Sequence, residues 1–201
     1  MKKILLLAVL ALALPMAVFA SSGVDYTNSG GTLSGSNSGL SLSGSVLIAV
    51  NGLNGGGLIT GNNLGSVSFA TGALTSGTLA SGGQFAGGGL FTITSNGSGV
   101  PSGTLFTGTF DGPVTWTLVT LANGTHNYTL TGTVSGTSGS GFSTVGVTVQ
   151  LTINTGRGFF NGSTTVSSGD TNIVVPEPGS LSLLGTGLIG LAGVVRRKLK
   201  V

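Results

Sequence analysis

Few side chains in the central part of this sequence could carry out acid–base chemistry or bind a metal. Between residues 21 and 175 the candidates are His126, Arg157, Asp25, Asp111 and Asp170. A zinc site needs several His, Cys or carboxylate ligands close together, and the chain has one His and no Cys. A catalytic triad would depend on His126 alone. We therefore expect no metal, no cofactor and no enzymatic activity.

The local sequence suggests simpler roles for two of these residues. His126 follows the turn signal Asn123-Gly124, which predicts a position at the edge of a strand. Asp111 begins the segment Asp111-Gly112-Pro113, so we expect its carboxylate to cap a turn.

The charge of the chain is concentrated at its two ends. Six of the seven Lys and Arg residues lie within residues 2–3 and 196–200, and they account for the net charge of +3. The segment between residues 21 and 175 holds one Arg against three Asp, a net charge of −2. Because this segment has no cluster of basic side chains, we exclude a nucleic acid as partner.

Alternating apolar and polar residues predict strands that position the few ionisable groups. The clearest pattern places Val145, Val147, Val149, Leu151 and Ile153 on one face. The segment 114–118 alternates in the same way and predicts that Trp116 points inward. Shorter patterns occur in three further segments: Val46, Ile48 and Val50; Val67 and Phe69; and Phe91 and Ile93.

These patterns predict an all-β fold. Strands with one apolar face, separated by turn signals such as Asn96-Gly97, favour antiparallel sheets. We expect a β-sandwich with Greek-key or jelly-roll connections over residues 45–174, preceded by a flexible, Ser/Gly-rich lead-in at 21–44. A β-solenoid is the alternative, suggested by the 39 glycines and many threonines. The uneven spacing of the Thr-x-Thr pairs argues against that regular repeat.

The N-terminus has the pattern of a secretory signal peptide. Lys2 and Lys3 precede an apolar run from residue 4 to residue 14, and small residues precede a cut after Ala20. We predict that residues 1–20 form a signal helix and that the mature chain begins at Ser21.

The C-terminus has three features in order. The segment Val175-Pro176-Glu177-Pro178-Gly179-Ser180 comes first, an uncharged stretch over 181–195 follows, and a basic cluster occupies 196–200. Fifteen helical residues span about 22 Å, less than a typical hydrocarbon core, so we expect a short, transient membrane helix. Arg196, Arg197 and Lys198 should stay in the cytoplasm. The two prolines should keep 175–178 extended, outside that helix.

This C-terminal arrangement resembles the PEP-CTERM sorting signal. The resemblance rests on Pro176-Glu177-Pro178, the apolar stretch and Arg196-Arg197-Lys198, and it covers residues 175–201. It implies recognition of Val175–Pro178 by an exosortase, a membrane enzyme of Gram-negative bacteria that also make extracellular polysaccharide. The implied route passes through the inner membrane and ends at the cell surface or outside the cell.

The central domain favours a structural or interaction role. Low charge and abundant hydroxyl and amide side chains are suited to a component of the cell surface or extracellular matrix. A carbohydrate-binding module is the alternative, with extracellular polysaccharide as a candidate partner. Such modules present exposed Trp or Tyr rings, and Tyr26 and Tyr128 are the candidates that remain once Trp116 is placed inside.

Overall fold

The computed structural model describes residues 23–141 and 143–174, which belong to one unit. The predicted signal helix at 1–20 and membrane helix at 181–195 lie outside the described residues, as do the predicted signal cleavage between Ala20 and Ser21, the sorting residues Val175–Pro178 and the basic residues Arg196–Lys198. Among the described residues, no helix is long and apolar enough to cross a membrane.

The described residues form thirteen strands and one short 3-10 helix. In chain order the elements are β1 (Gly23–Ser29), β2 (Thr32–Ser36), β3 (Gly39–Asn51), η1 (Leu53–Gly55), β4 (Ile59–Ala70), β5 (Leu74–Thr78), β6 (Gly82–Phe85), β7 (Gly88–Ser95), β8 (Gly103–Phe110), β9 (Val114–Thr120), β10 (His126–Ser138), β11 (Ser143–Asn154), β12 (Ser163–Thr165) and β13 (Ser168–Val174).

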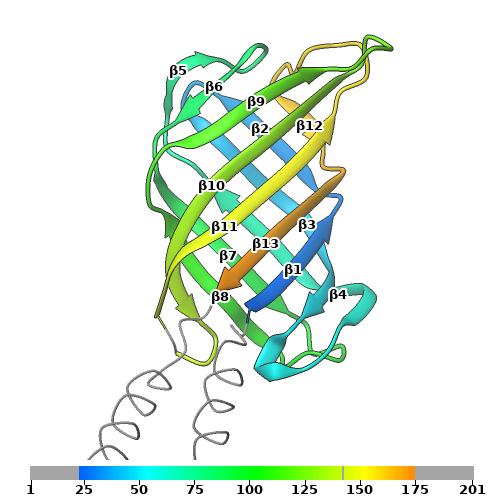
Figure 1. The fold of residues 1–201 in the computed structure, drawn as a ribbon, viewed down its shortest axis with the longest axis vertical. Helices are drawn as coiled ribbons and strands as arrows, with labels where there is room; N and C mark the ends of the chain where they lie inside the picture. The colour runs from blue at the N-terminus through cyan, green and yellow to red at the C-terminus, as the bar shows by residue number, and fades with distance from the viewer. Residues whose placement is uncertain (1–22, 142, 175–201) are drawn as a thin grey trace, which may run out of the picture. The chain divides into compact units, whose positions relative to one another are not determined.

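Eight of these strands close into a barrel (Figure 1). Around the ring they follow the order of the chain: β1, β3, β4, β7, β8, β10, β11 and β13. The ring closes because β13, the last strand, pairs with both β11 and β1. Every pairing is antiparallel, so each ring strand lies beside its neighbours in the sequence, as in an up-and-down barrel.

The prediction of an antiparallel all-β domain is confirmed, but the predicted sandwich is not what the strands form. A single sheet closes on itself instead of two sheets packing face to face. The sequential order around the ring also differs from Greek-key or jelly-roll connections, and antiparallel pairing rules out the β-solenoid. Bulges in the β3–β4 and β10–β11 pairs increase the local twist and curvature that closure requires.

The two ends of the barrel differ. One end, here the exit end, holds Gly23, Val174 and the connections β3–β4, β7–β8 and β10–β11. The opposite end, here the far end, holds the other connections, into which β2, β5, β6, β9 and β12 are inserted. There β9 and β6 extend the sheet beside the first half of β10, and β2 pairs with the first part of β3 and with β12.

The flexible lead-in predicted at 21–44 is wrong from Gly23 onward. This segment contains β1, β2 and the first part of β3, and β1 is a ring strand with a partner on each side. Tyr26, Leu33 and Leu40 are fully buried in the barrel. The many Ser and Gly residues conceal the strands because only every second residue needs to be apolar in a half-buried strand.

Aromatic and aliphatic side chains fill the interior. Phe69, Phe91 and Phe110 meet edge-to-face or stacked, with ring centroids 5.8–6.3 Å apart. Val67 and Ile93 also point inward, as predicted. These contacts fix the inward face of β4, β7 and β8, because a slip of one residue would turn the whole apolar set toward solvent.

Bulges overturn three of the predicted inward positions. Val145 is 78% exposed and Thr144 is buried instead, although Val147 to Ile153 point inward as predicted. Gly146 has φ of 73°, and the register shifts between Val134 and Gly136 on the partner strand. In β3, bulges place Leu47 and Val50 inside but leave Val46 and Ile48 half-buried.

Candidate functional site

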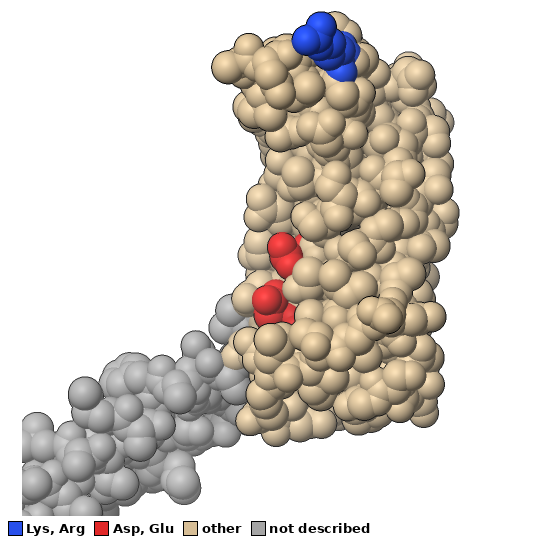
Figure 2. All heavy atoms as spheres, turned by 90° about the vertical axis from the view of Figure 1, so that its right-hand side faces the viewer, with Lys and Arg blue, Asp and Glu red and all other residues tan. Residues whose placement is uncertain are grey.

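Two of the three described carboxylates lie on the outer wall of the barrel. Asp25 on β1 is opposite Asn172, and Asp170 on β13 is opposite Thr27. Figure 2 shows acidic groups on the wall and a basic group at an end of the barrel. Arg157, in the β11–β12 connection, is the one Lys or Arg among the described residues. Burial, and then the negative charge of Asp170, raises the pKa of Asp25 above its ordinary value of 3.8.

Asp111 does not join that pair. Its Oδ2 atom accepts a hydrogen bond of 2.8 Å from the Ser135 hydroxyl on β10, and its backbone N–H donates to Thr133. The carboxylate therefore ties the β8–β9 connection to the neighbouring strand instead of capping its own turn. The described residues contain no group of three His, Cys, Asp or Glu that could hold a metal ion.

His126 begins β10, as predicted, at the far end of the barrel. It is buried, and its Nδ1 lies 3.0 Å from the Thr120 hydroxyl. The ring stacks on Phe159 with centroids 4.3 Å apart. This partner set positions the imidazole through a hydroxyl and an aromatic ring, which is a packing arrangement and not a Ser-His-Asp triad.

The aromatic side chains that could have bound a sugar are instead buried. Trp116 and Tyr128 stack with centroids 4.9 Å apart, and Phe160 packs against both. The indole N–H of Trp116 donates to Leu79 O, and the Tyr128 hydroxyl donates to Ala80 O and accepts from Phe160 N–H. Tyr26 is also buried, which raises its pKa to about 12. The inward prediction for Trp116 is confirmed.

The far end exposes another aromatic side chain, Phe159, which the sequence analysis did not identify as a candidate. Phe159 is 56% exposed while it covers His126, and Arg157 lies two residues away in the same connection. Val119 and Leu121 of the β9–β10 hairpin are also exposed near His126. The adjacent Phe159 and Phe160 could have indicated that one ring faces out, because neighbouring side chains of an extended segment point to opposite sides.

The outer wall itself is polar and nearly uncharged. Cross-strand pairs align hydroxyl and amide side chains over β9, β10, β11, β13 and β1. These outward residues are Thr115, Thr117, Thr129, Thr131, Thr133, Thr148, Gln150, Thr152, Asn172 and Thr27. The wall therefore offers many weak hydrogen-bonding groups and no aromatic ring among these positions.

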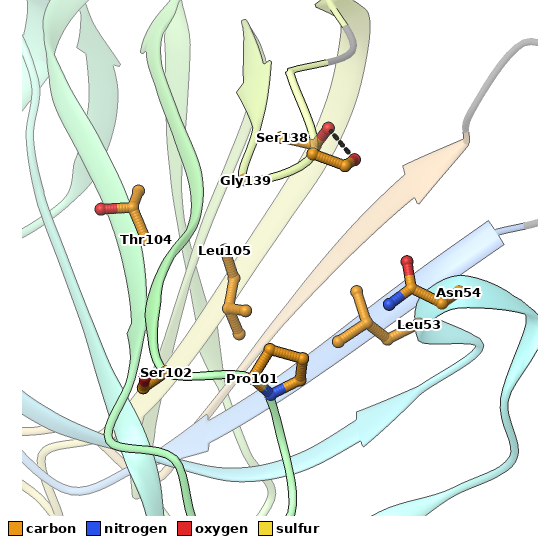
Figure 3. Close-up of a pocket in the computed structure, with 9 residues that line it drawn as sticks. Leu53, Asn54, Pro101, Ser102, Thr104, Leu105, Ser138 and Gly139 are labelled. Atoms are coloured by element: carbon orange, nitrogen blue, oxygen red, sulfur yellow. Dashed lines mark hydrogen bonds between the residues drawn. The ribbon is translucent and has the colours of Figure 1, made fainter.

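A pocket of about 220 Å³ opens at the exit end (Figure 3). Leu53 of η1, Pro101 of the β7–β8 connection and Leu105 of β8 converge on it, and Ser138 and Ser140 form its hydroxyl side. The pocket lies near the chain's point of exit, since η1 contacts β1 and Gly52 lies against Gly23. No charged side chain lines it.

The chain leaves the barrel directly beside the point where it entered. Val174, the last residue of β13, is opposite Gly23, the first residue of β1. The next residue along the chain is Val175, the first of the four predicted sorting residues.

Comparison with protein families matches residues 174–198 to the PEP-CTERM protein-sorting motif. No curated protein and no solved structure matches the chain. The match includes Val175–Pro178 and extends to Lys198, so it covers residues 175–198 of the sorting signal predicted at 175–201. The family's description concerns sorting and does not describe the barrel. The chain therefore carries a PEP-CTERM sorting motif, which indicates an exported protein that is sorted through the membrane and processed by an exosortase.

Proposed function

We propose that this exported protein is a structural or interaction component of the cell surface or extracellular matrix of a Gram-negative bacterium, and that it is not an enzyme. The inner membrane would hold it only until exosortase processing is complete. The observation that carries the proposal is a closed barrel with a polar, nearly uncharged wall, joined directly to a sorting motif.

The arrangement of ionisable groups supports a non-enzymatic role. His126 is packed against Thr120 and Phe159, and Asp111 bonds to Ser135. Asp25 and Asp170 lie on the outer wall and do not line the pocket at the exit end. General acid–base catalysis needs such groups within reach of one bound substrate, and His126, Asp111 and the Asp25–Asp170 pair belong to separate parts of the barrel.

The sorting part of the proposal is tested by changing both prolines of the motif. In a Pro176→Ala/Pro178→Ala variant the membrane helix should extend backward, because alanine allows the helical backbone that proline blocks. We expect this variant to accumulate uncleaved in the inner membrane with its barrel still resistant to protease. Mass spectrometry of both termini, on protein from cells and medium, measures the outcome. Normal cleavage of the variant would contradict the sorting role, and a mature terminus other than Ser21 would contradict the predicted signal peptide.

Carbohydrate binding is the second candidate, and Phe159 favours it. An exposed aromatic ring can stack on a sugar face, and Arg157, two residues away along the chain, is a hydrogen-bond donor. Affinity electrophoresis of the purified barrel in gels containing the producer's polysaccharide tests this. We expect retardation that is lost in Phe159→Ala and kept in Val145→Ala, which removes an exposed apolar side chain elsewhere. Equal mobility with and without polysaccharide would leave the purely structural role.

The absence of a cofactor is tested separately. If the barrel folds without a metal, a chelator should leave the Tm of purified residues 21–174 unchanged. A marked fall in Tm would point to a metal ligand near Asp111 or the Asp25–Asp170 pair and would contradict this part of the proposal.

A further inference from the structure

The sorting motif follows the barrel without a linker. The matched motif begins at Val174, which is also the last residue of β13 and pairs with Gly23. An extended chain advances at most about 3.6 Å per residue, so Pro176 lies within roughly 7 Å of Val174. Any enzyme that holds Val175–Pro178 must therefore come within a few ångströms of the exit end.

The strand that carries the motif is firmly held. β13 has a partner on each side, β11 and β1, and Thr171 and Ile173 are buried. Peeling β13 away would open the closed ring and expose two strand edges at once. The short distance between barrel and motif therefore cannot easily be lengthened by unravelling the last strand.

The surface of the exit end is suited to contact with an enzyme that holds the sorting motif. Leu53, Pro101 and Leu105 point toward one another across the pocket (Figure 3), and serine and threonine hydroxyls surround them. Its lining carries no charge, so bringing it against an apolar or weakly polar protein surface leaves no charged group desolvated. The far end, by contrast, carries Arg157 in the β11–β12 connection.

We propose that the exit end of the barrel is a docking surface for exosortase, contacted while the enzyme holds the sorting motif. This inference rests on the proposed exosortase processing. The partner is a membrane-embedded enzyme whose surface around the active site packs on the rim formed by η1 and the β7–β8 and β10–β11 connections. The barrel then contributes to recognition together with the motif.

A charge placed on the rim tests the contact. Ser102 lines the pocket and is exposed, so Ser102→Glu adds a charge without disturbing the core. Thr131→Glu places the same charge on the exposed wall and is the matched control. We expect the rate of cleavage to fall about tenfold in Ser102→Glu and to stay unchanged in the control, because a charge desolvated at an interface weakens binding. Leu53→Asp is a second, stronger variant.

An inserted spacer distinguishes a loss of docking from a general defect of the Ser102→Glu variant. Inserting about ten Gly/Ser residues after Val174 allows the motif to reach up to roughly 35 Å from the barrel. In this background Ser102→Glu should be cleaved at the same rate as the spacer chain alone. An equal loss with and without the spacer, or no loss in the native spacing, would overturn the proposal.

A disulfide tests whether β13 stays in place during cleavage. Asp25 and Asn172 are paired across β1 and β13 and both point outward, at a Cα separation that suits a disulfide. Since the chain has no Cys, Asp25→Cys/Asn172→Cys forms one defined bond after export. Normal cleavage of the oxidised variant supports docking. Blocked cleavage, restored by reductant, would show that β13 must peel away and would overturn the docking proposal.

The sorting function has its own test. Failure of the native chain to be cleaved by any exosortase would refute the sorting function itself.

Discussion

The hydroxyl of Tyr128 joins two inserted segments at the far end of the barrel. It donates a hydrogen bond of 2.6 Å to Ala80 O in the β5–β6 turn. It also accepts one of 3.1 Å from Phe160 N–H in the β11–β12 connection. Tyr128→Phe keeps the ring and its stack on Trp116 but removes both bonds.

The cost follows from the burial of the two groups left behind. Phe160 is buried, so its N–H loses its partner without access to water. Ala80 is half-buried, so water replaces part of its lost bond. At about 1–3 kcal/mol for each buried unpaired group, we expect the free energy of unfolding to fall by about 2–3 kcal/mol. For a domain of this size, that lowers the Tm by roughly 4–12 °C.

Tyr26→Phe is the matched control. Tyr26 is buried to the same degree, but its hydroxyl makes no hydrogen bond with any described residue. Its removal should change the free energy of unfolding by about 0.5 kcal/mol or less. Thermal unfolding of purified residues 21–174, followed by circular dichroism, measures both variants. Equal Tm values for the two would refute the bridging role of Tyr128.

Three further predictions concern the bulge and the outer wall, all measured by thermal unfolding of the same fragment. Gly146→Ala should cost about 1 kcal/mol because of its positive φ, whereas Gly112→Ala, which has equal space and no positive φ, should be nearly neutral; equal costs would contradict the bulge. Val145→Ala should leave stability unchanged while Val147→Ala costs about 2 kcal/mol, and the reverse order would contradict the register. Because the folded-state pKa of Asp25 is raised, folding loses stability as the pH rises above 3.8; Asp25→Asn should raise the Tm at pH 7 and leave it unchanged near pH 3, and a lower Tm at pH 7 would refute this sign.

Local patterns were sufficient for the strands and for the sorting motif. Alternation placed Trp116, Phe91 and Leu151 inside, because burying one face of a strand requires an apolar residue at every second position. The motif at Val175–Pro178 was readable because its prolines, apolar stretch and basic cluster act through their order along the chain.

Tertiary structure decided which strands pair and therefore what the ends of the barrel carry. Closure depends on β13 pairing with β1 across almost the whole length of the domain, and no local pattern encodes so distant a partner. Register shifts decided that Val145 faces out and Thr144 faces in, because one inserted residue reverses every side chain beyond it. The same long-range pairing brings Gly23, Val174 and the rim of the pocket to one end, and moves Phe159 and Arg157 to the other. Such positions follow from the sum of many cross-strand contacts, which only the complete fold brings together.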